Sequence, residues 1–341
     1  MKSLANQLIT WHAKSGRHHL PWQKSKDPYA VWVSEIMLQQ TQVATVIDYY
    51  QRFMKKFPTI KALANADEEE VMRLWSGLGY YRRARFLHEG AQMIMHDMQG
   101  IFPSDFEMMM KIPGIGRSTA GAIAAFSFNQ RKAILDGNVK RIFARYFLIT
   151  EWTGLPNIEK KLWAYAESLL PKKAIAIYTQ ALMDLGATVC NKKPLCPLCP
   201  LKKTCVAFLK NKVHAVPLPR PKKNIPTQSI YMVIIKNYEE VLLEKRPHQG
   251  IWGGLWSLPQ YENKTINTGN WVKKKFGFDA VMIKKNLHIT TTFTHFKLNI
   301  TYSILETKSQ RSTQPYTWIP LEDLEGAALP AVIRKILLKL K

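Results

Sequence analysis

The chain of 341 residues is predicted to fold as a mainly helical region followed by a smaller α+β domain. Before residue 210, apolar side chains recur at helical spacing, as they do in residues 31–57. After residue 225 the pattern changes to strands, and apolar side chains alternate with polar ones in residues 296–304. Proline and basic residues dominate the stretch between these parts. We therefore place the helical region at 1–212, a linker at 213–227 and the α+β domain at 228–341.

The elements of the second part follow from short patterns. Residues 229–236 and 241–246 are apolar runs separated by a polar turn, and residues 296–306 form a third run with strand alternation. Residues 332–340 place their apolar side chains on one stripe, which predicts a closing helix. Strands next to a helix give the α+β class.

The chain is strongly basic. It carries 49 Lys and Arg against 25 Asp and Glu, a formal net charge of +24, which favours a polyanionic partner such as nucleic acid. No apolar run is long enough to span a membrane, so we expect no membrane partner. The N-terminal residues lack the apolar stretch of a secretory signal, which predicts a reducing, cytoplasmic location.

All four cysteines are clustered in 16 residues, with the spacing Cys190-x5-Cys196-x2-Cys199-x5-Cys205. Such clustering is typical of metal ligation and not of scattered core thiols. Four thiolates at this spacing fit either a tetrahedral zinc ion or a 4Fe-4S cluster, and the spacing alone does not decide between them.

A glycine-rich turn is predicted between two helices at residues 108–127. Gly114 and Gly116 permit a tight turn, and a helix that begins near Arg117 offers free backbone N–H groups to a DNA phosphate. An ordinary helix junction with a glycine cap is the alternative. About twenty residues further on, Asp136 precedes another helical pattern, where an N-cap is the simplest role for its carboxylate.

These two segments, IPGIGRSTAG and LDGNVKRI, resemble the helix-hairpin-helix glycosylase superfamily, and within it the MutY branch of adenine glycosylases. The motifs LPWQ, SEIMLQQTQV, GLGYYRRAR and QALMDLGATVC match in the same order, so the resemblance covers nearly the whole chain. It implies a helix-hairpin-helix fold with an iron-sulfur module and a C-terminal Nudix-like domain. The implied activity is base-excision repair by a monomer, near the nucleoid, that flips and removes adenine paired with 8-oxoguanine or guanine in double-stranded DNA.

Cleavage of the bond between adenine and deoxyribose requires a proton for the base and negative charge beside the sugar. The resemblance assigns these tasks to Glu35 as general acid, held neutral by its surroundings, and to Asp136 as an ionised carboxylate. A solvated helix position is the simple alternative for Glu35.

The resemblance implies further DNA- or substrate-binding residues at Gln39, Gln40, Tyr80, Ser118, Asn138 and Gln180. Gln40 and Tyr80 would wedge into the base stack during flipping, although core packing is an alternative for Tyr80. Gln39 and Gln180 would contact the target strand and the flipped adenine.

Ser118 bears on strand cleavage. Relatives of the endonuclease III type have a lysine at this position, which forms an imine with the sugar, and serine cannot do so. We therefore expect a monofunctional glycosylase, while Lys140 remains able to trap the sugar occasionally. A bifunctional lyase and an inactive DNA-binding scaffold are the two competing functions.

The resemblance favours a 4Fe-4S cluster at the cysteines, with a structural role. It also makes the last domain Nudix-like, although the glutamates that hold Mg²⁺ in Nudix hydrolases are absent, with Gln260 at one of their positions. We expect this domain to recognise 8-oxoguanine through Phe293, Thr294 and His295, where the family commonly has Phe-Ser-His. The alternative is that these residues are only strand core.

Overall fold

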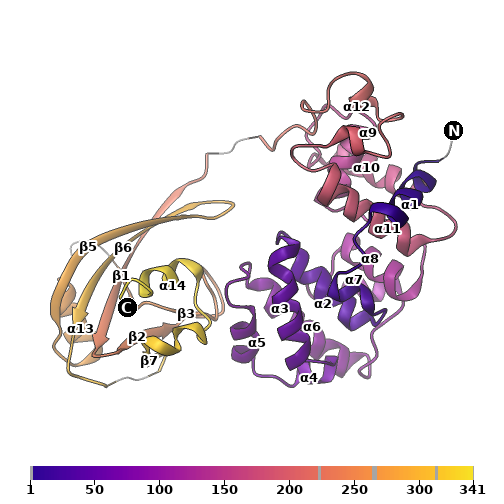
Figure 1. Ribbon diagram of the computed structural model, residues 1–341. Helices are drawn as coiled ribbons and strands as arrows, with labels where there is room; N and C mark the ends of the chain where they lie inside the picture. The colour runs from indigo at the N-terminus through magenta and orange to yellow at the C-terminus, as the bar shows by residue number, and fades with distance from the viewer. Residues whose placement is uncertain (1–2, 222–223, 263–266, 312–313, 341) are drawn as a thin grey trace. The chain divides into compact units, whose positions relative to one another are not determined.

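The structure is a computed structural model that describes residues 3–221, 224–262, 267–311 and 314–340. The chain forms two compact units, and each combines segments that are distant in sequence. Unit 1 comprises Met1–Ala66 and Phe86–Lys222, and it is helical (Figure 1). Unit 2 comprises Asp67–Arg85 and Lys223–Lys341, and it contains the sheet.

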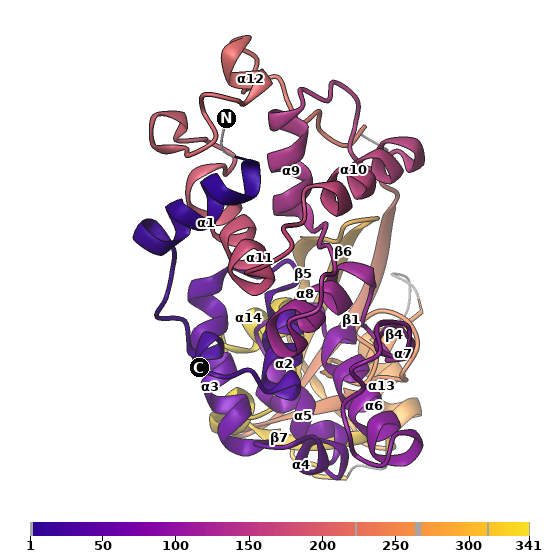
Figure 2. The same cartoon turned by 90° about the vertical axis from the view of Figure 1, so that its right-hand side faces the viewer.

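Unit 1 is built from helices whose buried faces are apolar. They are α1 (Leu4–Ser15), α2 (Pro28–Leu38), α3 (Val43–Lys56), α4 (Ile60–Ala64), α6 (Arg82–Asp97, which begins in unit 2), α7 (Phe106–Lys111), α8 (Arg117–Phe128), α9 (Gly137–Tyr146), α10 (Pro156–Ser168), α11 (Ile175–Asp184) and α12 (Val206–Leu209). Helix α8 contacts both α2 and α11, and α1 lies along α11 (Figure 2). Buried side chains from α1, α8, α9, α10 and α11 form one continuous cluster.

The segment 31–57, whose spacing predicts helix, is two helices with a break between them. The Asp27 side chain caps α2 by accepting a hydrogen bond from the Tyr29 N–H, with Pro28 at the first helical position. Helix α2 ends at Leu38, and α3 begins at Val43. Gln40 has a φ of 58°, which no helix accommodates, so the chain turns there.

The glycine-rich turn joins α7 to α8. Gly114 has a φ of 79°, and a Cβ built on it would lie 3.0 Å from the Phe86 Cβ. A side chain at this position would therefore be strained and crowded, which explains the glycine. Helix α8 begins at Arg117 with Gly116 as its N-cap, so its first N–H groups have no side-chain cap.

Unit 2 is built on a mixed sheet with helices on both faces. Its strands are β1 (Thr227–Asn237), β2 (Glu240–Lys245), β3 (Trp256–Ser257), β4 (Gln260–Tyr261), β5 (Val281–Thr292), β6 (Lys297–Glu306) and β7 (Tyr316–Pro320). The order is β3-β2-β1-β6-β5, with β4 on β1 and β7 on β2, and β1 runs parallel to β6. Successive side chains of β1 pack on opposite faces, one against α14 (Ala331–Leu337) and one against α13 (Thr268–Phe276).

The segment Asp67–Arg85 belongs to unit 2 through specific polar contacts. In helix α5 (Glu68–Trp75), Glu69 accepts a hydrogen bond from the Trp256 indole at 2.7 Å and pairs with Lys245 at 3.1 Å. Arg85 donates to the Gly253 carbonyl at 2.7 Å. This segment is thus tied to the sheet domain although it precedes that domain by some 140 residues.

Candidate active site

Unit 1 contains a cavity of about 910 Å³ whose walls come from residues 12–26 and from α2, α8, α9 and α11. The residues of the sequence prediction that line it are Glu35, Gln39, Ser118, Asp136, Asn138 and Gln180. These positions span 146 residues of sequence, and the packing of α2 and α11 against α8 brings them together. The cavity is therefore the candidate active site.

Glu35 lines this cavity from α2 and is not a solvated helix position. Its neighbours Ser34 and Ile36 are buried, and burial of the carboxyl raises its pKa to about 8, with the nearby Asp136 charge adding to the effect. The raised pKa favours the protonated form of this carboxyl at neutral pH. A protonated carboxyl facing a cavity is a candidate general acid.

Asp136 is the N-cap of α9. Its Oδ1 accepts the Val139 N–H at 2.8 Å and its Oδ2 accepts the Asn138 side-chain N–H at 3.1 Å. Burial raises the pKa of this carboxyl, while these hydrogen bonds and the charge of Arg141 act in the opposite direction. The cap predicted from the sequence is present, and it fixes the carboxylate rigidly at the cavity wall.

Arg141 is a residue that sequence reasoning missed. It donates to Asn138 Oδ1, to the Gly186 carbonyl and to the Cys190 carbonyl, each at 2.7 Å. Gly186 lies in a short π-helix (Leu185–Val189) that follows α11, and a Cβ on it would be 2.5 Å from the Asn138 Cβ. Arg141 and Gly186 thus fix the position of Asn138. Hydrogen bonds run from Asp136 through Asn138 and Arg141 to the Cys190 carbonyl.

Ser118 supports the backbone beside Asp136. Its hydroxyl accepts the Leu135 N–H at 3.0 Å, immediately before the capping residue. On the next residue of α8, the Thr119 hydroxyl accepts a hydrogen bond from the Gln39 side chain at 3.3 Å. Helix α8 therefore positions residues from both neighbouring walls of the cavity.

A second missed group surrounds Asp184 at the end of α11. Its carboxylate accepts hydrogen bonds from Arg17 and from the side chain of Gln180, one helical turn earlier. Trp22 and Gln23 of the LPWQ motif also line the cavity. The contacts of Asp184 bridge 167 residues of sequence, so no spacing pattern reveals them.

The other predicted residues of unit 1 lie outside this cavity lining. Gln40 is exposed in the turn between α2 and α3. Gly114, Gly116 and Arg117 form the start of α8, where the Arg117 guanidinium stacks on the Trp163 ring at 3.9 Å and pairs with Glu167. Gly116 and Arg117 are exposed, so the uncapped N-terminus of α8 lies at the protein surface.

Tyr80 and the segment 293–295 belong to unit 2. Tyr80 is 50% exposed with a φ of 50°, so it is not core packing. Thr294 and His295 are exposed at the tip of the hairpin that joins β5 to β6, and the Thr294 hydroxyl lies 3.2 Å from His295 Nδ1. Phe293 instead packs on Phe296, with ring centroids 4.5 Å apart. The strand-core alternative therefore does not hold for Thr294 and His295.

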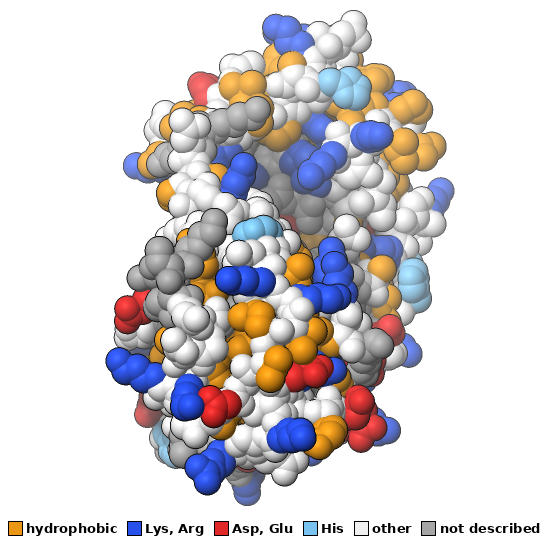
Figure 3. All heavy atoms as spheres, turned by 90° about the vertical axis from the view of Figure 1, so that its left-hand side faces the viewer, with side chains coloured by type: hydrophobic (Ala, Val, Ile, Leu, Met, Phe, Trp, Pro, Cys, Tyr) orange, Lys and Arg blue, Asp and Glu red, His pale blue; other side chains and the backbone are white. Residues whose placement is uncertain are grey.

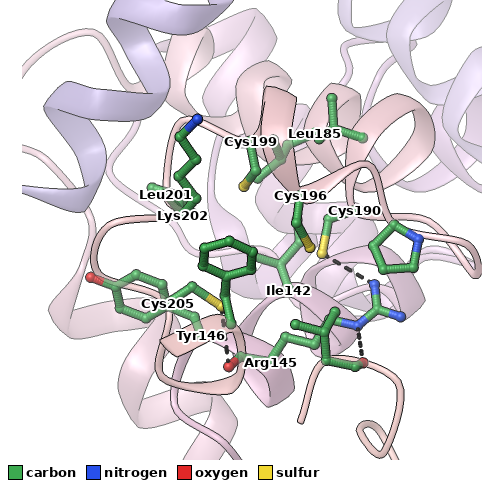
Figure 4. A pocket seen from close by; sticks show the side chains of 14 residues that line it. Ile142, Arg145, Tyr146, Leu185, Cys190, Cys196, Cys199, Leu201, Lys202 and Cys205 are labelled. Atoms are coloured by element: carbon green, nitrogen blue, oxygen red, sulfur yellow. Dashed lines mark hydrogen bonds between the residues drawn. The ribbon is translucent and has the colours of Figure 1, made fainter. Parts of the chain in front are cut away.

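The four cysteines surround one pocket in unit 1 (Figure 4). Its other walls are largely apolar, and Arg145 donates to Cys190 Sγ at 3.4 Å. Burial raises the pKa of the Cys199 thiol to about 12, so its thiolate needs a neighbouring cation. Among the described residues, no three His, Cys, Asp or Glu side chains converge on a point that would hold a single metal ion.

The excess of Lys and Arg over Asp and Glu is seen on the surface of the protein. On the face shown in Figure 3, Lys and Arg side chains are more abundant than Asp and Glu. In the part of the chain that the structure describes, no helix is long and apolar enough to cross a membrane. The surface charge is the type that phosphate backbones attract.

Comparison with known proteins defines the class. Residues 33–168 match the family of HhH-GPD superfamily base excision DNA repair proteins, and residues 230–339 match the NUDIX domain. A solved thermostable thymine-DNA glycosylase is 28% identical and superposes with a TM-score of 0.56 over 60% of this chain and 95% of its own. A DNA complex of endonuclease III, 22% identical, has the same helical fold, with a TM-score of 0.52 over 61% of this chain and 94% of its own. The chain thus has the helix-hairpin-helix fold of base-excision DNA repair proteins together with a Nudix-like domain, which confirms the predicted fold class.

Relatives that match nearly the whole of this chain identify its branch of the superfamily. The adenine DNA glycosylase of Buchnera aphidicola from Acyrthosiphon pisum is 39% identical over 98% of this chain and 97% of its own. The mouse adenine DNA glycosylase is 32% identical over 97% of this chain and 76% of its own. This chain belongs to the adenine DNA glycosylase family, an enzyme family of DNA base-excision repair. The resemblance stated from the sequence motifs is confirmed.

Proposed function

We propose that this enzyme removes adenine paired with 8-oxoguanine or guanine in double-stranded DNA, as a monofunctional hydrolase that acts as a monomer. The observation that carries the proposal is the presence of two unlike carboxyls in one cavity, Glu35, whose pKa burial raises, and Asp136, which hydrogen bonds hold in place. Two carboxyls in different environments are what glycoside hydrolysis requires.

The chemistry follows from these two groups. Glu35 gives its proton to N7 of the flipped adenine, so the base leaves with the electron pair of the N-glycosidic bond. Asp136 stabilises the positive charge that develops on the sugar. Water then adds to the sugar carbon, and its proton goes to the Glu35 carboxylate, which restores the acid. No covalent bond to an amine is required, in keeping with serine at position 118.

Single-turnover base release tests this function. Duplexes with adenine opposite 8-oxoguanine, guanine or thymine are treated with the enzyme and analysed with and without alkali. We expect rapid adenine release from the first two, and strand breaks only after alkali exposes the abasic sites. Direct nicking of oxidised-pyrimidine duplexes, with no adenine release, would instead support the lyase.

We further propose that unit 2 recognises the base opposite adenine and has no pyrophosphohydrolase activity. The resemblance to Nudix hydrolases implies metal-binding glutamates at about the position of α13, but this helix contains three lysines and no carboxylate. Thr294 and His295 offer exposed polar groups on a tip that the Phe293–Phe296 stack holds in place. These groups suit hydrogen bonding to a base edge.

Substitution of the hairpin tip is expected to reduce selectivity. In His295→Ala, we expect the ratio of adenine release opposite 8-oxoguanine to release opposite guanine to fall by about tenfold, the effect of one lost base contact. Duplexes of both kinds are compared at saturating enzyme. His288→Ala is the control, because this histidine lies in the middle of β5 and contacts Thr301. An unchanged ratio in His295→Ala would remove the hairpin from the recognition model.

We propose that Cys190, Cys196, Cys199 and Cys205 hold a 4Fe-4S cluster with a structural role. All four thiols line one largely apolar pocket, and the resemblance to iron-sulfur glycosylases favours a cluster over zinc there. Such a group supplies the positive charge that a buried thiolate at Cys199 needs.

Metal analysis checks this assignment. Protein purified without oxygen is expected to be brown, with about four iron atoms per chain. We expect Cys199→Ala to lose the colour and to melt at a lower temperature, because α12 and its loops lose their anchor. Colourless wild-type protein with one equivalent of zinc would show that the tetrahedral alternative is correct.

A further inference from the structure

The amide of Gln180 and the carboxylate of Asp184 are neighbours on one face of α11. Gln180 is half-buried and lines the active-site cavity. Its side-chain Nε2 donates a hydrogen bond to Asp184 Oδ1 at 3.0 Å, within one helical turn. Asp184 itself is only 1% exposed, so it acts behind the cavity wall.

Asp184 is anchored by residues from the start of the chain. Its Oδ2 accepts the backbone N–H of Arg17 at 2.7 Å, and its Oδ1 accepts the Arg17 Nε–H at 2.8 Å. The His12 ring nitrogen Nε2 lies 3.2 Å from Oδ2. Burial disfavours the charge on Asp184, but the contacts from His12 and Arg17 outweigh it and hold the pKa of the carboxyl below its usual value.

An ionised carboxylate fixes which way the glutamine amide is turned. It has acceptor sites only, so it cannot donate a hydrogen bond to the Gln180 oxygen. The Gln180 NH₂ group must therefore point to Asp184, and the carbonyl oxygen Oε1 is left as the acceptor that the side chain offers elsewhere. The two flipped orientations of the Gln180 amide have almost the same shape. Without Asp184, this side chain would present its NH₂ donor to the cavity as readily as its oxygen acceptor.

We propose that Asp184, held by Arg17, is a positioning residue that locks the Gln180 amide with its oxygen toward the substrate, so that the site selects a base with an exocyclic amino group. This inference rests on the proposed function. Adenine presents N6–H₂, which donates to an oxygen. Hypoxanthine, nearly identical in shape, presents a carbonyl at the same position and would face oxygen against oxygen. Selectivity then comes from repulsion as well as from attraction.

The test compares three bases opposite 8-oxoguanine under single-turnover conditions. These are adenine, hypoxanthine and purine, which lacks any group at C6 and so reports general damage to the site. In Asp184→Asn, the introduced amide can donate to Gln180 and permits the reversed orientation. We expect the adenine-to-hypoxanthine ratio of rates to fall by about tenfold or more, the factor for one exchanged hydrogen bond. Purine release should change much less than this ratio does.

A double-mutant cycle separates orientation from mere structural support. With Gln180→Leu there is no amide to orient, so adding Asp184→Asn should leave the ratio unchanged. If Asp184→Asn does not fold, Arg17→Lys keeps the charge but removes the guanidinium contact, and we expect a smaller fall in the same ratio. An unchanged ratio in both single variants, or an equal effect of Asp184→Asn with and without Gln180, would overturn the inference. A wild type that releases no adenine from either mispair would overturn the proposed function instead.

Discussion

Asp136→Asn is expected to lower the single-turnover rate of adenine release by about a thousandfold or more, because the sugar loses the negative charge that stabilises its transition state. Asparagine is nearly isosteric and is itself a good N-cap, so the hydrogen bond from the Val139 N–H is retained. DNA affinity should change little, since the phosphate contacts expected from the hairpin are not affected. Rates and dissociation constants are measured on the same duplex.

Asp105→Asn is the matched control for this substitution. Asp105 caps α7 in the same way, through a 2.8 Å hydrogen bond from the Met108 N–H, but it is exposed and does not line the cavity. We expect this control to retain the wild-type rate. Base release by Asp136→Asn within tenfold of wild type, with binding intact, would refute the assigned role of Asp136.

The prediction for Asp136 relies on a feature that the sequence could show, because a helix cap is local. LDGNV combines an Asp with the start of an apolar helical pattern, and three residues are enough to define the cap. The glycine-rich turn before α8 was predictable for the same reason. Each of these elements depends on backbone preferences within a few positions.

Contacts over long sequence distances were not predictable. Arg17 meets Asp184 across 167 residues, Arg141 meets the Cys190 carbonyl across 49, and Ser118 meets the Leu135 N–H across 17. Each contact joins a helix residue to a loop residue that the tertiary fold brings beside it, and no spacing rule describes it. Such contacts set the orientation of side chains in the cavity. Sequence motifs therefore name the residues of the site, but they do not show how these residues are oriented.

The amino-acid composition of two segments gave no sign of the structure that they form. The turn at Gln39–Gln42 lies between residues with good helix propensity, so the positive φ of Gln40 could not be predicted from local sequence. Strand β5 was not predicted, because Val281–Thr292 carries lysines, threonines and an asparagine with little apolar alternation. Its pairing with β6 determines the strand.

Glu35→Gln is expected to lower the rate of base release by about 10²- to 10⁴-fold, the usual contribution of a general acid. The pH dependence gives a sharper test than the rate itself. Glu35 acts in its protonated form, and burial raises its pKa to about 8. In the wild type the rate should therefore fall as the pH rises through this value, because the carboxyl loses the proton that adenine needs.

Glutamine carries no titratable proton, so the residual activity of Glu35→Gln should lack this alkaline decline. Glu89→Gln, a substitution at an exposed position of α6, is the control and should keep both the rate and the decline. A decline of equal size in Glu35→Gln would mean that another group, or the DNA itself, titrates in this range. The shape of the profile thus distinguishes proton donation by Glu35 from a structural contribution, since loss of packing alone would lower the rate at every pH by the same factor.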